Sequence, residues 1–355
     1  MNKRAAICLL GTWFWQQHAW AHSTVSELAE LSLEDLLEIR VEDQQGNVGS
    51  MKEQKKWSLN FGVYSQRLGG YRSGSRNVAN DYVLVMSGEP RLETNYPVLA
   101  TEIEQTVLTA SMSYQLSERD TLSLTVPYVR QKTDHMSVIE DYSSFTIDTE
   151  GVGDVGMSWR NQFYRDAICQ FSAGVGVSLP TGSIDEWGDT PRAPGDQQLP
   201  YTMQLGSGTY DAKFNLGMSW YFASWTWVTD AAYVRRLGTN DRNYKLGNRF
   251  TIATTWHRAL GDKLKLELGG AYQTSGAISG SDREIEMPGP FPYPASITDP
   301  ANFGGDIARL RARLTYQLSE SQSISAGYDD PLYQHLNGVQ PKAKGRFLFN
   351  WMIEF

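Results

Sequence analysis

The sequence ends with Arg346-Phe-Leu-Phe-Asn-Trp-Met-Ile-Glu-Phe355, a stretch in which two kinds of side chain alternate. Successive side chains of a β-strand point to opposite sides, so one face of this strand is aromatic or β-branched and the other is mostly polar. The first face comprises Phe347, Phe349, Trp351, Ile353 and Phe355. In water, an aromatic strand at a chain end would aggregate, whereas a closed barrel in lipid has no free edge and needs an apolar outer face. The stretch therefore favours the last strand of a transmembrane β-barrel over a strand of a soluble sandwich.

The start of the chain has the features of an export signal. Asn2-Lys-Arg4 is basic, residues 5–15 form a short apolar run, and Ala19-Trp-Ala21 has the small-x-small pattern of a cleavage site. The apolar run is too short to cross a bilayer as a helix. We therefore predict that residues 1–21 are a signal peptide, which is removed before His22.

Composition excludes several classes of protein. After the loss of Lys3 and Arg4 with the signal, 30 basic residues stand against 40 acidic ones, a net charge of about −10. No basic tract indicates nucleic acid, and a mean hydropathy of −0.42 without a long apolar run excludes a helical membrane protein. Cys169 is the only cysteine beyond the signal, so no intrachain disulfide is expected, and the sequence indicates no cofactor and no metal site.

Alternation continues from Trp57 to the end of the chain and predicts an all-β, up-and-down antiparallel barrel of twelve strands. The predicted strands are residues 57–63, 108–116, 122–128, 155–163, 169–179, 210–222, 225–233, 250–256, 264–272, 310–318, 324–328 and 346–355. Short turns alternate with long loops, which are expected near 69–100, 133–150, 181–202, 238–246, 277–304 and 334–341. Bacterial barrels have short periplasmic turns and long extracellular loops, and an even number of strands leaves both termini in the periplasm. Residues 57–355 are therefore predicted to form an outer-membrane barrel with both chain ends periplasmic.

Aromatic side chains cluster beside the predicted short turns, as in the periplasmic girdle of an outer-membrane barrel. They are Trp57, Tyr114, Phe163, Trp220, Phe222, Trp225, Trp227, Trp256, Tyr316, Trp351 and Phe355. A soluble sandwich of similar strands would have no reason to segregate its aromatic residues or its loop lengths in this way. The aromatic pattern therefore supports the membrane barrel.

If the apolar face meets lipid, the charged side chains of the opposite face line the interior. The clearest case is the predicted tenth strand, where Arg309, Arg311 and Arg313 alternate with apolar residues. Each arginine would cost about 2–4 kcal/mol if it faced lipid near the midplane, so all three are expected inside. The other charged residues predicted on the inner face are Asp154, Arg160, Asp211, Lys213, Asp230, Arg249, Lys265, Glu267 and Arg346.

Two interpretations of this interior remain open. The arginines can pair with acidic residues of neighbouring strands and simply fill the barrel, or they can form a positively biased constriction that filters solutes by charge. The two are compatible, because a twelve-stranded wall lies between a filled eight-stranded barrel and an open sixteen-stranded porin. The charged inner residues are therefore candidates for binding a small solute.

Residues 22–56 precede the barrel and contain one helical pattern over 32–40. Ser32 can cap this helix and Asp35 can return the bond. The run Leu31-Ser-Leu-Glu-Asp-Leu-Leu37 resembles the start of many TonB-dependent receptors. The segment is far too short for the plug domain of those receptors, so the resemblance does not imply energised transport. It is expected to be either a short periplasmic helix at the barrel mouth or a tethered linker.

Five strings, in chain order, resemble a known family. They are Gly151-Val-Gly-Asp154, Ser178-Leu-Pro-Thr-Gly182, Gly206-Ser-Gly-Thr-Tyr-Asp211, Tyr244-Lys-Leu-Gly247 and Tyr333-Gln-His-Leu-Asn-Gly-Val-Gln340. Together they are similar to the outer-membrane transporter family named for the MetA pathway of phenol degradation, over residues 57–355. The closing strand also resembles that of bacterial outer-membrane barrels, whose terminal aromatic residue is read by the assembly machinery. The family resemblance implies the movement of small, often hydrophobic or aromatic, compounds across the outer membrane.

Three classes of function follow from these patterns. We favour a passive, selective channel for small solutes over an enzyme. An outer-membrane lipid hydrolase could use a serine, a histidine and an acid from distant strands, and His135 and His335 lie near predicted loops, but no Gly-x-Ser-x-Gly elbow accompanies them. A structural barrel of a cell-envelope complex is the third. The expected partners are outer-membrane lipid and lipopolysaccharide, the barrel assembly machinery through Phe355, and a small solute, without nucleic acid.

Overall fold

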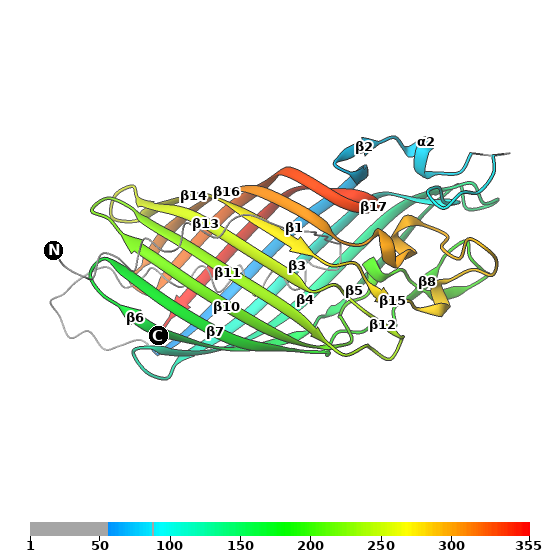
Figure 1. Ribbon diagram of the computed structural model, residues 1–355. Coiled ribbons are helices and arrows are strands. Elements are labelled where there is room, and N and C mark those ends of the chain that lie inside the picture. The colour runs from blue at the N-terminus through cyan, green and yellow to red at the C-terminus, as the bar shows by residue number, and fades with distance from the viewer. Residues whose placement is uncertain (1–55, 87–88) are drawn as a thin grey trace, which may run out of the picture.

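The computed structural model describes residues 56–86 and 89–355, most of which form one closed antiparallel β-barrel (Figure 1). Eleven strands make the ring: β1 (Trp57–Gly74), β3 (Val98–Gln115), β4 (Asp120–Ser137), β6 (Val155–Arg165), β7 (Cys169–Leu179), β10 (Tyr210–Tyr221), β11 (Thr226–Leu237), β13 (Arg249–Ala259), β14 (Leu264–Ser275), β16 (Gly305–Ser319) and β17 (Gln322–Glu354). Each strand pairs with the next, and β17 pairs with β1 to close the ring. The predicted all-β barrel is therefore confirmed, whereas the predicted signal peptide and the helix at 32–40 lie outside the described residues.

The strands form where apolar and polar residues alternate. In β1, Phe61 and Val63 are exposed on the outer face, whereas Tyr64, the residue after Val63, is buried on the inner face. The register extends this order across the wall, because Val63 lies opposite Leu108 and Leu108 lies opposite Tyr128. All these outward side chains are apolar and exposed. The barrel is thus apolar outside, as a membrane barrel requires.

The predicted count of twelve strands differs from the eleven of the ring at β17. This element has 33 residues; its first part pairs with β16 over residues 322–336, and its last part pairs with β1 over residues 336–354. The Gln334 side chain donates to the Ala343 carbonyl over 2.8 Å, so the two parts lie side by side. The segment predicted as a loop at 334–341 is therefore β-structure, and the last two predicted strands are the two parts of the single element β17.

Several strands are longer than predicted, most of all β1, β3 and β4. β1, β3 and β4 each have 18 residues, against 12 for β10 and β11. Two further strands lie outside the ring and extend this side of the wall: β2 (Arg76–Val78) pairs with β1, and β5 (Ser144–Val152) pairs with β4. Much of the loops predicted at 69–100 and 133–150 is therefore strand.

Charged residues on the outer face explain this error. Beyond the apolar row of Val63, Leu108 and Tyr128, the outward side chains of these long strands are ion pairs. We call this set the charged belt; it comprises Arg67, Glu102, Glu104, Arg130, Lys132, Asp134, Glu150 and Lys344. In the belt the outer face of the strands is charged, whereas the inner face carries polar residues such as Gln105 together with apolar ones such as Leu68 and Ile103. The outward apolar row that predicts a membrane strand therefore stops there while the hydrogen-bonded ladder continues.

The long connections gather at one end of the barrel and the short turns at the other (Figure 1). The long connections contain α2 (Asn80–Val83), β8 (Trp187–Asp189), β9 (Asp196–Gln198), η3 (Tyr201–Met203), β12 (Tyr244–Lys245), β15 (Ser279–Gly280), η4 (Arg283–Ile285), η5 (Ser296–Thr298) and η6 (Pro300–Asn302). Beside the short turns, aromatic rings pair on the outer face: Trp57 lies 4.5 Å from Tyr114, and Phe222 lies 4.0 Å from Trp225, between ring centroids. None of the helices over 56–86 and 89–355 is long and apolar enough to cross a membrane.

Candidate functional site

Three arginines of β16 form a ladder on the inner face. Arg309, Arg311 and Arg313 are each buried, while the alternating residues Leu310, Ala312 and Leu314 are exposed on the outer face. Strand alternation produces this split, since every second side chain points inward. Each arginine has one small partner on a neighbouring strand: Arg309 lies opposite Ala271, Arg311 opposite Gly269, and Arg313 opposite Gly327. The small partners leave room for three long side chains inside the wall.

Acidic residues of adjacent strands hold the ladder. Arg311 Nε lies 3.5 Å from Asp329 Oδ2, and Arg313 Nη1 lies 3.8 Å from Glu267 Oε2. Asp329 also pairs with Arg346, which is buried on the other part of β17. The predicted residues Arg311, Arg313, Glu267 and Arg346 are thus brought together, and Asp329, which was not predicted, joins them.

A second ion pair adjoins the ladder. Arg160 of β6 donates to Asp230 of β11 over 3.0 Å. The pair lies over Gly217 of β10, because a side-chain Cβ at this glycine would stand 2.6 Å from Asp230 Oδ1 and 2.7 Å from Arg160 Nη2. A glycine is therefore required where the two charges cross the inner face. Lys265 Nζ lies 3.5 Å from Glu267 Oε1 and adds a further basic group to this region.

A small cavity lies among these charges. Its lining residues are Val228, Asp230, Ala253, Thr255, His257, Glu267, Arg311, Ala312, Arg313 and Asp329. Its volume of about 20 Å³ is room for about one water molecule. The cavity therefore offers a small polar space between the side chains of β11, β13, β14, β16 and β17.

The opposite wall of the interior is neutral. Beside apolar residues such as Val107 and Val129, its inward side chains include hydroxyls and amides, among them Gln105, Ser111, Ser113, Thr125 and Gln131. They bond to one another across the strands: Ser111 Oγ lies 2.8 Å from Thr125 Oγ1, and Ser113 Oγ lies 2.7 Å from Ser123 Oγ. β1, β3 and β4, which the structure describes in full, contribute no buried Asp, Glu, Lys or Arg. A solute inside the barrel would thus have a charged wall on one side and a neutral polar wall on the other.

Two predicted acids belong to a separate network that fixes a loop. Asp154 accepts hydrogen bonds from the Gly182 and Ser207 backbone amides, over 2.9 and 2.8 Å. Asp211 pairs with Arg236 over 2.5 Å and is fully buried. These residues anchor the connection between β7 and β10 to the wall and are not part of the ladder. Their role is structural.

Three of the five family-like strings meet at this anchor. Gly182 and Gly206 lie so close that a Cβ at Gly206 would stand 2.5 Å from the Gly182 carbonyl oxygen and from Asp154 Oδ1. Asn240, from the next long connection, donates to the Ser207 carbonyl over 3.1 Å. These three strings therefore hold the long connections against the rim of the barrel.

Lys213 and Arg249, which the sequence also placed inside, are buried in one row of the wall. Both pair with Val234 of β11, Lys213 from β10 and Arg249 from β13. They lie nearer the long connections than the ladder does. Arg249 is the first residue of β13, whereas Thr255 and His257 lie near the other end of this strand, at the level of Arg311 and Arg313. The basic character of the interior therefore extends beyond the ladder.

The connection between β7 and β10 folds into the barrel. Leu205 packs in one buried cluster with Tyr64, Val107, Val129 and Leu348, which come from four strands of the ring. Gln131 of β4 donates to the carbonyl of Gln204 over 3.0 Å, and Thr149 of β5 donates to that of Met203 over 2.8 Å. This segment therefore packs against inward-facing residues of the wall. The sequence offered only its Gly and Pro content as a signal, which indicates a loop and not its place.

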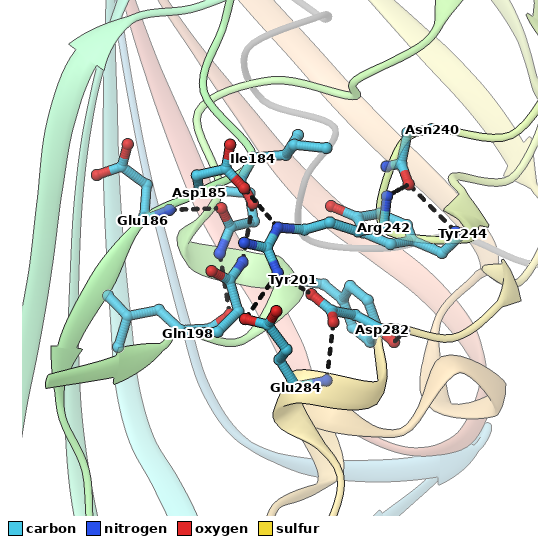
Figure 2. A network of polar contacts seen from close by, with 12 residues as sticks. Ile184, Asp185, Glu186, Gln198, Tyr201, Asn240, Arg242, Tyr244, Asp282 and Glu284 are labelled. Atoms are coloured by element: carbon cyan, nitrogen blue, oxygen red, sulfur yellow. Dashed lines mark hydrogen bonds and ion pairs between the residues drawn. The ribbon is translucent and has the colours of Figure 1, made fainter.

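Three long connections are fastened together over this end of the barrel, as Figure 2 shows. Arg242 lies between acids of two other connections: its Nε is 2.6 Å from Asp185, and its Nη1 is 3.2 Å from Asp282 and 3.1 Å from Glu284. Burial opposes the charge of Arg242, but the hydrogen bonds to Asp185 and Glu284 prevail and raise its pKa. We call these four residues the Arg242 clamp.

An apolar cluster supports the clamp. It comprises Tyr201, Tyr244, Leu246, Ile278, Ile285 and Phe303. The Tyr201 hydroxyl accepts a hydrogen bond from the Asp282 backbone amide over 2.9 Å, which joins the cluster to the clamp (Figure 2). Burial raises the pKa of the Tyr201 and Tyr244 hydroxyls far above their ordinary value, so both stay neutral. Together the clamp and the cluster form a lid.

The fold resembles that of solved outer-membrane barrels. An outer membrane channel from Pseudomonas putida F1 matches with a TM-score of 0.56 over 87% of this chain and 100% of that chain, at 12% sequence identity. A FadL homologue from Pseudomonas aeruginosa has a TM-score of 0.40 at 12% identity over 85% of this chain and 91% of that chain. A mutant of the TodX monoaromatic hydrocarbon channel has a TM-score of 0.45 at 9% identity over 85% and 91%.

The sequence itself matches no protein-family model and no curated protein. The similarity to the Pseudomonas putida channel establishes a shared barrel fold. The family resemblance drawn from the five strings is not confirmed, although the barrel that it implied is present.

Proposed function

We propose that this protein is an outer-membrane channel that passes small solutes passively through a narrow, arginine-lined interior. The observation that carries the proposal is a closed barrel that is apolar outside and bears the ladder of Arg309, Arg311 and Arg313 inside. A barrel of this polarity is stable in a bilayer and unfavourable in water. The fold shared with the outer membrane channel of Pseudomonas putida F1 supports the same location.

The interior charge favours small anions. The ladder and Arg346, Lys213, Arg249 and Arg160 outnumber the acids that face them, Asp230, Glu267 and Asp329. A ring of basic side chains in a narrow, low-dielectric passage attracts anions and repels cations. We therefore infer charge-selective passage without energy coupling.

Planar-bilayer recording tests the proposal. The purified protein should give discrete single-channel conductance with a preference for anions. Replacement of Arg309 by Gln should lower the anion-to-cation permeability ratio about threefold, because one inward positive charge is removed. Arg309 is the best first target, since its Nη1 atom contacts the neutral Gln273 whereas Arg311 and Arg313 contact acids.

The matched control is Arg67→Gln in the charged belt, which removes an arginine from the outer face beside Glu104. This variant should keep the wild-type ratio. A bilayer that stays silent with folded protein would overturn the channel, and an unchanged ratio in Arg309→Gln would overturn the role of the ladder.

We also propose the orientation and partners that a channel of this kind requires. Residues 1–21 act as a removed signal, the short turns and both termini are periplasmic, and the Arg242 clamp is extracellular. Phe355 is offered to the barrel assembly machinery, and the outer face contacts lipid and lipopolysaccharide. A protease added to intact cells should therefore cut the connections that carry the clamp and leave the short turns uncut.

A further inference from the structure

We propose that Arg130 and Lys132, two basic residues of the charged belt, bind phosphate groups of lipopolysaccharide. The inference rests on the proposed outer-membrane location and orientation of the protein, and not on the passage of a solute through its interior. Both residues belong to β4 and point outward, with side chains that are 64% and 50% exposed. They are two residues apart on one face of the strand, which places them about 7 Å apart along it. Two exposed positive charges therefore stand next to each other on the outer wall.

Arg130 and Lys132 lie where the apolar outer surface ends. From Leu122 to Tyr128 the outward side chains of β4 are apolar, and Arg130 is the first charged side chain that follows them on this face. The long connections lie at this end of the barrel (Figure 1), which the proposed orientation places outside the cell. The leaflet on that side of an outer membrane consists of lipopolysaccharide, whose first phosphates sit directly beside its acyl chains. The two basic side chains are therefore at the depth of these phosphates.

The height of the charged belt suits the large headgroup of lipopolysaccharide. On β4 the belt runs from Arg130 to Asp134, and these residues lie opposite Thr106 and Glu102 of β3. Four residues of strand span about 14 Å, or about 10 Å along the bilayer normal at the usual tilt of barrel strands. A phospholipid headgroup layer is only about 5–8 Å thick. Lipopolysaccharide carries phosphorylated sugars above its acyl chains and presents a thicker charged layer, so it matches the belt better than a phospholipid does.

The ion pairs of the two residues leave donors for a phosphate. Arg130 Nε lies 2.7 Å from Glu150 Oε2, and Lys132 Nζ lies 3.2 Å from Asp134 Oδ1. A guanidinium has five N–H donors and an ammonium has three, so one carboxylate partner does not use them all. Ion pairs as exposed as these contribute little to stability. The acids therefore hold the basic groups in place while further donors stay available to phosphate oxygens, which are strong acceptors.

Acidic side chains lie beside the two basic ones. Glu104 of β3 and Asp148 of β5 lie opposite Lys132, and Glu150 of β5 lies opposite Arg130. Lipopolysaccharide molecules pack side by side through divalent cations, which prefer carboxylate and phosphate oxygens as ligands. A phosphate bound to Arg130 or Lys132 can therefore keep its divalent cation, with a neighbouring carboxylate in reach of it. Alternating charge thus suits a layer of phosphates and cations.

The experiment measures the binding of purified lipopolysaccharide to the folded protein in detergent with magnesium present, by native mass spectrometry. The double variant Arg130→Gln/Lys132→Gln should raise the apparent Kd about tenfold or more, because two charge-assisted contacts to phosphate are lost. Lipopolysaccharide stripped of its phosphates should bind the wild type as weakly as the intact lipid binds this variant.

The matched control is Arg258→Gln/Lys263→Gln. It removes the same two kinds of charge from exposed positions at the short turn between β13 and β14, and it should keep the wild-type Kd. Phosphatidylglycerol is the second probe, because it carries a single phosphate in a small headgroup. It should bind the wild type more weakly than lipopolysaccharide does, and the double variant should bind it about as well as the wild type does.

Each variant is first checked for a folded barrel by its faster migration on an unheated gel, and the single variant Arg130→Gln replaces the double variant if that does not fold. An unchanged Kd in the folded belt variant, or an equal loss in the control, overturns the inference. Equal affinity for phosphatidylglycerol, lost in the same variant, overturns it in favour of a general site for anionic lipid. Conductance is recorded separately in bilayers of phospholipid alone, so a silent bilayer with the expected lipopolysaccharide binding overturns the channel and supports this inference.

Discussion

Asp329 is the residue that joins the two parts of β17. Its carboxylate pairs with Arg311 of β16 over 3.5 Å and with Arg346, and all three side chains are buried. One acid thus balances two arginines at the place where the last element of the chain meets both of its neighbours. Arg346 lies in the last part of β17 and Asp329 in its first part, so their ion pair holds the two parts together.

Asp329→Asn tests this role. The amide keeps the shape but removes the charge, which leaves two buried guanidinium groups without their carboxylate. Breaking a buried ion pair from one side costs about 3–5 kcal/mol, so we expect a loss of stability of that size, read from urea unfolding of the barrel in lipid vesicles.

Asp330→Asn is the matched control. Asp330 is the next residue and points outward, where it is exposed. Its replacement should change the stability by less than about 0.5 kcal/mol. Equal losses in the two variants would contradict the role of Asp329.

Sequence reasoning could find the arginines but not Asp329. Arg309, Arg311 and Arg313 stand out because charge alternates with apolar residues along one strand. Asp329 lies in Asp329-Asp-Pro331, after the apolar alternation has ended at Tyr328. Two adjacent acids carry no periodicity, so the face on which each lies is decided only by pairing with β16.

At the scale of elements, the lid is the feature that separates this barrel from an open tube. The Arg242 clamp ties together the connections that follow β7, β11 and β14 (Figure 2). One partly buried arginine holds three acids from two of these connections. Its removal should therefore free all of them at once.

Arg242→Gln tests the lid. Loss of the ion pairs should let the connections separate, so we expect the mean single-channel conductance to rise about twofold or more. High salt should raise the wild-type conductance disproportionately, since it screens the exposed acids Asp185 and Glu284.

The control is Arg283→Gln, which removes an exposed arginine of η4 beside the clamp. It should leave the conductance and its salt dependence unchanged. An identical conductance in Arg242→Gln and wild type would mean that solutes do not pass through the lid.

Elements differed in how well the sequence predicted them. The short turns after β3, β6, β10, β13 and β16 lie where the alternation broke, because a tight turn sits directly between two apolar-faced strands. The conformation of the long connections could not be predicted from the sequence, because Leu205 and Arg242 contact strands and loops that are far away in the chain. The charged belt was mistaken for loop because its outward side chains are charged, so the outward apolar row that marks a membrane strand is missing there.

At the scale of the whole molecule, the change from apolar to charged side chains on the outer surface indicates where the bilayer ends. On the β1, β3 and β4 side, apolar rows run from Trp57 to Val63, and the charged belt follows directly. Ala110 lies within the apolar rows, opposite Phe61, and Thr106 lies at the first row of the belt, opposite Ser65. Both belong to β3 and point outward, so they differ in depth alone.

Arginine substitutions at these two positions test the depth. Ala110→Arg should cost about 2–4 kcal/mol of unfolding free energy in lipid vesicles, because the charge enters the hydrocarbon. Thr106→Arg should cost about 0–1 kcal/mol, because it stays near the headgroups. Similar costs at both positions would contradict the proposed membrane boundary.

The pairing between β1 and β17 also determines when the ring can close during folding. It pairs Ser58 with Glu354, the first strand of the ring with the last, whereas the other contacts of the ring join strands that are near neighbours in the sequence. Contacts between distant parts of a chain form slowly, because the whole intervening loop must be ordered first. Hairpins can therefore form in any order, but the ring closes only when residues 336–354 pair with β1. Until this pairing forms, the sheet has two unsatisfied edges that would pair with any other extended chain, so the pairing of β1 with β17 is the step that removes the last open edges.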